Sequence, residues 1–247
     1  MQEFAISLDT DIFMWVNSRH NQYWDAFMYV VSSRTAWIPL YAMILYAIYL
    51  SFGWRTMILM GLMTAVAVAA ADQISASLLR PLFERLRPSN LDNPISQYVH
   101  IVQGHRGGRY GFPSSHAANT FAVATLTSLL FRRKEYTICV ILWAITVCYS
   151  RLYLGMHYPG DILAGLSVGA VCGAVCYACA GFVLLLFVKV VPYKHEARQI
   201  VATYRRGAPS IRSRIFGHDI TWRPTYLPVA TAILTTLLIL LYSAIFN

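Results

Sequence analysis

Long apolar runs constrain this chain more than any other feature of its sequence. A helix needs about 20 mostly apolar residues to cross the hydrocarbon core of a bilayer. Six runs approach that length, at residues 36–52, 57–79, 114–130, 136–150, 161–188 and 227–246. They lack the alternation of polar and apolar residues that is typical of a transmembrane barrel, and charged residues make up only 13% of the chain. We therefore predict an all-α integral membrane bundle of about six transmembrane helices.

The sequence outside these runs suggests four parts. Residues 1–32 carry Glu3, Asp9 and Asp11 near their start, so they do not resemble a cleavable signal. Aromatic and methionine side chains alternate there with polar ones, which indicates an N-terminal interfacial segment. The other parts are a transmembrane core at 33–191, a basic cytoplasmic linker at 192–226 and an extra transmembrane helix at 227–247. Five cysteines fall inside the predicted spans, where we expect them to be small packing residues.

Basic residues suggest an orientation. If the spans alternate, the connection at 132–134 lies on the same side as segment 189–223, which has eight Lys or Arg against Glu196 and Asp219. Such a bias marks the cytoplasmic side, and it also suits contact with anionic lipid headgroups. The opposite side carries arginines too, at positions 80, 85, 87, 106, 109 and 151. A bound anion on that side would account for them.

The first polar island on that opposite side is residues 80–89, RPLFERLRPS. Arg80 and Arg87 are seven residues apart, so on a continuous helix both would project from one face. Guanidinium groups suit phosphate because their planar fork donates several hydrogen bonds and stays charged. Snorkelling arginines at a membrane boundary are the alternative interpretation. Asp72, about two turns earlier, is a functional candidate as an acid within a span, but we favour a structural role in which it pairs with a buried polar neighbour.

The second island is YGFPSSHAANT, residues 110–120. Ser114 or Ser115 is a suitable helix N-cap, and His116 falls in the first turn. A helix N-terminus attracts anions, and the histidine beside it can exchange a proton. An ordinary cap with a surface histidine is the alternative.

The third island is residues 150–165, SRLYLGMHYPGDILAG. His157 and Asp161 are four residues apart, so in a helical turn the carboxylate can accept a hydrogen bond from Nδ1 of the imidazole. The free Nε2 would then be the reactive atom. Arg151 lies nearby in the sequence, and a purely structural hydrogen bond is the alternative.

Together the three islands resemble the signature motifs of the type 2 phosphatidic acid phosphatase superfamily of integral membrane lipid phosphatases. The family pattern is Lys, six residues, Arg-Pro; then Pro-Ser-Gly-His; then Ser-Arg, five residues, His, three residues, Asp. This chain has Arg80, six residues, Arg87-Pro88; Pro113-Ser114-Ser115-His116; and Ser150-Arg151, five residues, His157, three residues, Asp161. The resemblance covers roughly residues 8–188. Arg80 replaces the family lysine and keeps its charge, and Ser115 replaces the glycine.

The resemblance implies a division of labour in the site. His157 is the expected nucleophile, Asp161 orients it, and His116 is the expected general acid and then base. Phosphate is expected to be held by Arg80, Arg87, Ser114, Ser115 and Arg151. We expect no metal or other cofactor, since the arginines supply the positive charge.

The expected substrate is a lipid phosphate held in the membrane. For a bacterial inner (cytoplasmic) membrane protein with its site facing the periplasm or outside, we favour undecaprenyl diphosphate. Phosphatidate, phosphatidylglycerophosphate and lipid A phosphates are the alternatives. Membrane lipids are the other expected partners, no nucleic acid is expected, and the sequence does not indicate a protein partner.

Three other classes fit parts of the pattern. A phospholipid transporter without hydrolysis would also place arginines at the membrane face. A serine protease would use Ser114 or Ser115 with a histidine, but its peptide substrates carry no dianion. A metal site of His116, His157 and Asp161 would require neighbouring acids rather than arginines, which repel a cation.

Overall fold

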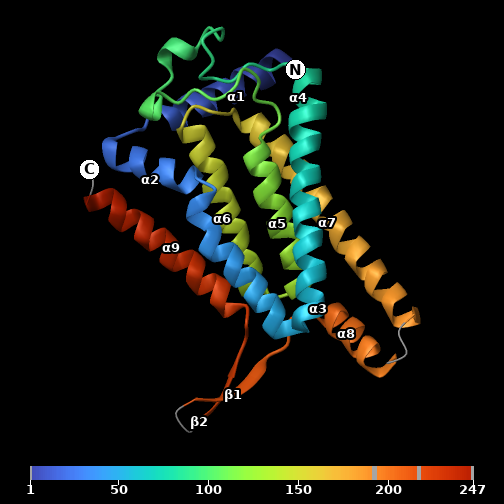
Figure 1. Cartoon of the computed structure of the whole chain (residues 1–247). Helices are drawn as coiled ribbons and strands as arrows, with labels where there is room; N and C mark the ends of the chain where they lie inside the picture. The colour runs from blue at the N-terminus through green and yellow to red at the C-terminus, as the bar shows by residue number, and fades with distance from the viewer. Residues whose placement is uncertain (1, 191–193, 216–217, 246–247) are drawn as a thin grey trace.

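The computed structural model describes residues 2–190, 194–215 and 218–245. Its helices are α1 (Gln2–Asn17), α2 (Gln22–Ser32), α3 (Ile38–Gln73), α4 (Arg80–Phe83), α5 (Ser115–Phe131), α6 (Lys134–Tyr153), α7 (Pro159–Val190), α8 (Lys194–Arg206) and α9 (Tyr226–Ile245). Short turns of helix are η1 (Thr35–Trp37), η2 (Ile74–Leu79), η3 (Ser96–Tyr98) and η4 (Val102–Gly104). The bundle confirms the predicted all-α membrane fold (Figure 1).

Helix α3 consists of two arms that run in opposite directions (Figure 1). The chain reverses at Gly53, whose φ of 81° and ψ of 170° are not helical. The arms correspond to the predicted runs 36–52 and 57–79. Glycine suits the reversal because it adopts positive φ without a steric penalty.

Among the described residues, four segments are long and apolar enough to cross a membrane, by length and composition. They are Thr35–Phe83, Lys134–Tyr153, Pro159–Leu186 and Tyr226–Ile245. The first contains both arms of α3. Helix α5 has 17 residues, most of them buried inside the bundle. The total of six crossings stays a prediction.

Small residues bring α5 and α7 unusually close. A methyl group built on Gly165, Gly169 or Gly173 would lie within 2.1–2.5 Å of a carbonyl oxygen of α5 or its cap. These glycines recur every four residues and form one stripe of α7. Backbone contact of this kind is a common way to associate membrane helices. The stripe fixes how the start of α5 sits against the start of α7.

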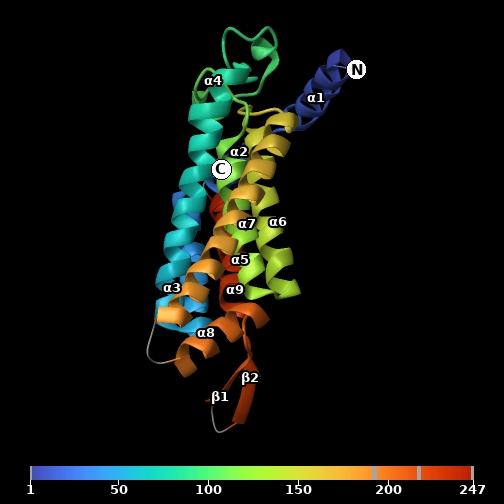
Figure 2. The same cartoon turned by 90° about the vertical axis from the view of Figure 1, so that its right-hand side faces the viewer.

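The N-terminal segment is two helices rather than one. Helix α1 crosses the end of the bundle that carries the 84–113 connection, and α2 lies below it (Figures 1 and 2). Asn17, at the end of α1, donates hydrogen bonds to the carbonyls of His100 and Tyr153 at 3.1 and 2.8 Å. Phe13 is fully buried with its ring 5.4 Å from that of Tyr158. Part of the predicted interfacial face therefore packs on protein.

The segment predicted as a basic linker, residues 192–226, contains regular structure. Helix α8 is followed by a hairpin of β1 (Ile211–Ile215) and β2 (His218–Trp222), with Ile211 opposite Trp222. Tyr204 of α8 donates a hydrogen bond to the carbonyl of Tyr177 at 2.5 Å. The Arg133 guanidinium contacts the Ala208 carbonyl, so the two basic connections lie at one end of the molecule.

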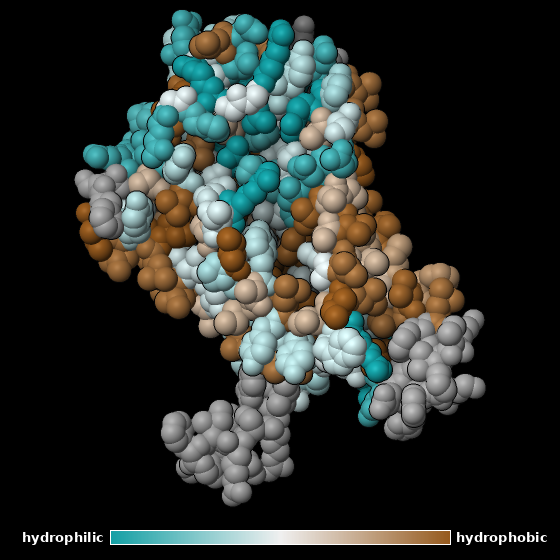
Figure 3. All heavy atoms as spheres, in the orientation of Figure 1, coloured by the Kyte–Doolittle hydropathy of each residue, from teal (hydrophilic) through white to brown (hydrophobic). Residues whose placement is uncertain are grey.

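The two ends of the molecule differ in character. Hydrophilic residues gather at the end formed by α1 and the 84–113 connection, while hydrophobic residues cover the flanks below it (Figure 3). The hydrophilic end holds the polar islands of the sequence. The basic connections lie at the other end.

Candidate active site

His157 is the buried centre of the site. It lies in the turn before α7, and only 1% of its surface is exposed. The Arg87 Nη1 atom is 3.2 Å from the imidazole Nε2. Arginine only donates hydrogen bonds, so Nε2 is the acceptor and the proton of the neutral ring lies on Nδ1. The Nε2 lone pair thus faces the arginine side of the site.

Asp161 lies behind the imidazole, in the first turn of α7. Its Oδ2 is 3.4 Å from Nδ1 of His157, in contact but without the alignment of a hydrogen bond. The same oxygen accepts the Tyr158 backbone N–H at 3.0 Å, and Oδ1 accepts from Arg85 at 3.0 Å. The turn around Tyr158 therefore fixes the carboxylate beside the ring, but the hydrogen bond predicted from the four-residue spacing is not formed.

Two residues that the sequence did not single out extend this arrangement. Arg85 also pairs with Asp9 of α1, and its guanidinium lies 4.1 Å from the centre of the Tyr158 ring. Asp9 accepts the Gly160 backbone N–H at 2.7 Å. A chain of charges thus runs from the N-terminal helix through Arg85 to Asp161. No sequence spacing joins these residues, because they meet only in the folded molecule.

Burial and the arginines hold His157 neutral. Burial first, and then the positive charges of Arg87, Arg151 and Arg80, lower the pKa of His157 well below its ordinary value of 6.5. Burial, followed by the charge of Arg80, lowers the pKa of Arg87 to about 10. Arg87 therefore stays charged at neutral pH while the imidazole does not. A neutral imidazole has a lone pair available for attack, and the neighbouring positive charges attract an anionic ester. His157 is therefore suited to act as a nucleophile.

The second island joins the third at the start of α5. Of the two N-cap candidates, Ser114 is the N-cap residue, but its side chain makes no capping hydrogen bond. Its backbone N–H instead donates to the Asp161 carbonyl at 2.9 Å. Arg80 of the first island donates to the Ser115 hydroxyl at 3.0 Å. The three islands, separate in the sequence, thus meet at one end of the bundle.

The route by which Arg87 reaches the site differs from the prediction. The helix ends at Phe83, and Glu84 has a φ of 44°, in the left-handed region. Arg87 then lies in extended backbone, where Leu86 bridges to Tyr110. The expectation that one helical face carries both arginines is therefore wrong.

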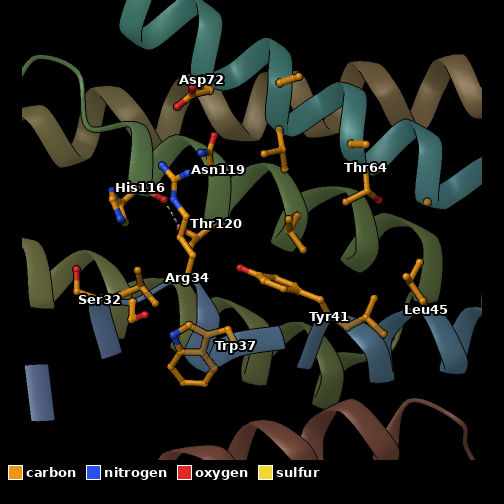
Figure 4. A pocket seen from close by; sticks show the side chains of 18 of the residues that line it. Ser32, Arg34, Trp37, Tyr41, Leu45, Thr64, Asp72, His116, Asn119 and Thr120 are labelled. Atoms are coloured by element: carbon orange, nitrogen blue, oxygen red, sulfur yellow. Dashed lines mark hydrogen bonds between the residues drawn. The ribbon is translucent and has the colours of Figure 1, made fainter. Parts of the chain in front are cut away.

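His116, in the first turn of α5, lies in the wall of a cavity. One cavity, of about 280 Å³, is lined by His116, Arg151, Arg34 and Ser32, among others. Arg151 donates to the Ser32 hydroxyl. Figure 4 shows the Arg34 guanidinium extending from the opposite wall into the space between His116 and Asn119. Arg34 precedes the family motifs, so their spacing gave no signal for it.

Several buried polar atoms of the site have no hydrogen-bond partner among the described residues. They include Nε of Arg80, Oγ of Ser114, Nε of Arg151 and Nδ1 of His157. A buried polar group without a partner costs about 1–3 kcal/mol. Donors of this kind, supplied by all three islands, suit an anion with several oxygens. Among the same described residues, no three His, Cys, Asp or Glu side chains are grouped as metal ligands.

Known proteins share both the sequence pattern and the fold. Residues 59–184 match the PAP2 superfamily. The chain is 45% identical to the lipid A 4'-phosphatase of Bacteroides thetaiotaomicron, over 72% of this chain and 79% of that protein. It is 32% identical to the lipid A 4'-phosphatase of Porphyromonas gingivalis, over 71% and 74%. Identity to the undecaprenyl-diphosphatase BcrC of Bacillus subtilis is 28%, over 63% and 75%.

A solved structure shows the shared fold. The crystal structure of Aquifex aeolicus LpxE superposes with a TM-score of 0.54 at 22% identity, covering 69% of this chain and 95% of that one. The sequence match spans the residues that hold all three motifs. The chain belongs to the PAP2 superfamily of integral membrane lipid phosphatases.

Proposed function

We propose that this protein hydrolyses a phosphate ester of lipid A through a phosphohistidine on His157. The observation that carries the chemistry is the Arg87 N–H donating to Nε2 of a buried, neutral His157. The choice of lipid A rests on the similarity to two lipid A 4'-phosphatases.

The first step transfers the phosphoryl group to the enzyme. The Nε2 lone pair of His157 attacks phosphorus, the bond from phosphorus to the sugar oxygen breaks, and His116 gives that oxygen a proton. The Arg87 N–H turns from Nε2 to a phosphoryl oxygen. Arg80, Arg151 and the Ser114 hydroxyl bind the other phosphoryl oxygens as their charge redistributes.

The second step releases phosphate. His116, now neutral, removes a proton from water, and the water oxygen attacks phosphorus. The bond from phosphorus to Nε2 breaks and returns neutral His157. Asp161 stabilises the positive charge that the imidazole carries while it is phosphorylated.

Hydrolysis of lipid A depends more strongly on proton donation by His116 than hydrolysis of undecaprenyl diphosphate does. The leaving group of the diphosphate is a phosphate, which departs readily, whereas lipid A releases a sugar hydroxyl that needs a proton. The sequence alone favoured undecaprenyl diphosphate, but the relatives support the lipid A alternative better. None of the relatives named above is a transporter or a serine protease.

The proposed location is the bacterial inner membrane, with the site facing the periplasm or outside. The support is the placement of both basic connections at the end opposite to the site. The arginines on the site end are then accounted for by their anionic ligand.

Phosphate release by the purified protein tests the proposal. Lipid A and undecaprenyl diphosphate are incubated separately in the same detergent with a chelator, and products are identified by mass spectrometry. We expect lipid A to lose one phosphate without added Mg²⁺, and the His157→Ala variant to release none. Lipid A left intact by the wild-type protein would refute the substrate, and activity that depends on a metal would refute the mechanism.

A further inference from the structure

A second and larger cavity begins at His116 and extends into the membrane-spanning part of the bundle. It holds about 600 Å³, within the range of about 300–1,000 Å³ typical of small-molecule sites. Its walls come from both arms of α3, from α5 and from the segment after α2 (Figure 4). Away from His116 the lining is mainly apolar, and includes Leu45, Ile48, Ala65, Val68 and Val123.

Polar side chains gather at the His116 end of this cavity. Asp72 and Asn119 line it beside His116, with Arg34 reaching in from the facing wall (Figure 4). The Oδ1 atom of Asn119 is buried and has no hydrogen-bond partner among the described residues. Asp72 has neither a hydrogen bond nor an ion pair with any described residue and acts on Arg80 only at longer range. The pairing partner expected for Asp72 from the sequence is therefore not found.

Asp72 and Asn119 place hydrogen-bond acceptors in the membrane-spanning part of the bundle, where an acceptor without a donor is unfavourable. A carboxylate within a membrane helix is unfavourable unless it meets a partner, and so is a buried carbonyl oxygen. Hydrocarbon supplies no donor. A ligand with hydroxyl or amide N–H groups would satisfy both acceptors.

The chemistry of the transfer step places the leaving group in this cavity. His157 attacks phosphorus from one side, so the leaving oxygen lies on the opposite side, toward the proton donor His116. His116 lines the cavity. The smaller cavity, which His116 also lines, contains Arg151, and the proposed mechanism assigns Arg151 to the phosphoryl oxygens. We therefore assign the part of the substrate that carries the leaving oxygen to the larger cavity.

We infer that this cavity binds the sugar and one acyl chain of the substrate, an inference that rests on the proposed function. Asp72 and Asn119 accept hydrogen bonds from the hydroxyl and amide N–H groups of the sugar that carries the phosphate. The acyl chain continues between the two arms of α3. An undecaprenyl chain has no donor next to its diphosphate, so it leaves both acceptors unsatisfied. The cavity thus selects lipid phosphates built on an amide-bearing sugar.

Two substitutions test this selection. Asp72→Asn removes the charge and keeps the shape, and Asn119→Leu removes the amide. The value of kcat/KM is measured for lipid A and for undecaprenyl diphosphate. We expect each variant to lower kcat/KM about 10- to 100-fold for lipid A and less than about threefold for undecaprenyl diphosphate. Thr146→Val is the control, because Thr146 is partly exposed on α6, lies outside the cavity lining and donates to the Leu142 carbonyl; we expect it to change neither value.

The outcomes separate this inference from the proposed function. Equal losses on both lipids, or no loss on lipid A, overturn the inference and leave a lipid A phosphatase. Wild-type protein that cleaves undecaprenyl diphosphate but not lipid A overturns both statements. If Asn119→Leu does not fold, Asp72→Asn alone decides the result.

Discussion

The two histidines of the site lie in very different surroundings. His157 is almost fully buried, its Nε2 is held by Arg87, and both oxygens of the neighbouring Asp161 are engaged. The His116 ring has no hydrogen bond with any described residue and faces two cavities. On the His157 side of the site, the protein's own residues supply the polar contacts. On the His116 side, the imidazole remains available to the substrate.

This difference fits the two tasks that we propose. A nucleophile gains from a fixed position before the substrate arrives, because no reorganisation is then needed during the reaction. A proton donor must instead meet the leaving group, whose structure differs from one lipid phosphate to another. Specificity therefore belongs on the His116 side.

The largest effects are expected from removing the two histidines in turn. His157→Ala should lower kcat on lipid A by about 10⁴-fold or more, because no other group forms the covalent bond. His116→Ala should cost about 10²- to 10⁴-fold on lipid A, which needs a proton on its leaving oxygen.

An aryl phosphate sharpens this comparison, since its leaving group departs without a proton. On it His116→Ala should lose much less activity, while His157→Ala should lose as much as before. Equal losses for His116→Ala on both substrates would contradict the general-acid role.

The next effect concerns the backbone contact between α5, which carries His116, and α7, whose first turn carries Asp161 beside His157. Gly169→Val would place a side chain 2.1 Å from the Ala118 carbonyl oxygen, where both helices present backbone. We expect the free energy of unfolding to fall by about 3 kcal/mol, measured as a lower thermal unfolding midpoint in detergent. Gly108→Val is the control, because the space around Gly108 is open. A midpoint equal to that of the control would show that α5 and α7 separate without cost.

Substitution of Asp9 tests whether the His157 side of the site depends on the N-terminal helix α1. Asp9→Asn weakens the ion pair that holds Arg85 against Asp161. Hydrogen bonds to charged groups contribute about 1.5–3 kcal/mol, so kcat should fall about 10- to 100-fold, with KM nearly unchanged. Asp11→Asn, on an exposed position of the same helix, should have no effect. A loss that appears in KM alone would assign Asp9 to substrate binding instead.

The smallest effect is a pH dependence of stability. The lowered pKa of His157 means that the unfolded imidazole takes up a proton as pH falls through about 6.5, while the folded one does not. Stability from this residue is thus present above pH 6.5 and lost below it, by about 1 kcal/mol over the next pH unit. Unfolding of wild type and His157→Gln, compared from pH 8 to 5.5, measures the difference. Parallel curves would show that His157 takes up the proton in the folded state as well.

Local patterns in the sequence predicted a large part of this molecule. The long apolar runs gave the helical bundle, and the predicted runs 36–52 and 57–79 correspond to the two arms of α3. The helix start at Ser114 or Ser115 and the proximity of His157 to Asp161 also followed from spacing alone, although the predicted hydrogen bond between the latter two is replaced by a 3.4 Å contact. Each depends on residues within one or two turns, where sequence distance sets distance in space.

What the sequence did not show depends on tertiary contacts. Asp9 and Arg85 lie 76 residues apart, and Arg34 reaches the site from a segment before the motifs. The break at Glu84 sends Arg87 to the site through extended backbone, so helical spacing gave a wrong route. One missed feature had a visible signal: glycines at every fourth position of α7 indicate close helix packing.

The most direct test of this account is to trap the phosphoryl group on the enzyme. An aryl phosphate labelled in its phosphate is mixed with the His116→Ala variant, and the quenched protein is mapped by mass spectrometry. The aryl leaving group departs without a proton, so the intermediate should form, whereas its hydrolysis lacks the base His116 and should be slow. We predict an acid-labile phosphohistidine at His157. It should be absent from the double variant that combines His116→Ala with His157→Ala. Label on any other residue, or turnover by the wild-type protein without a phosphorylated intermediate, would contradict this account.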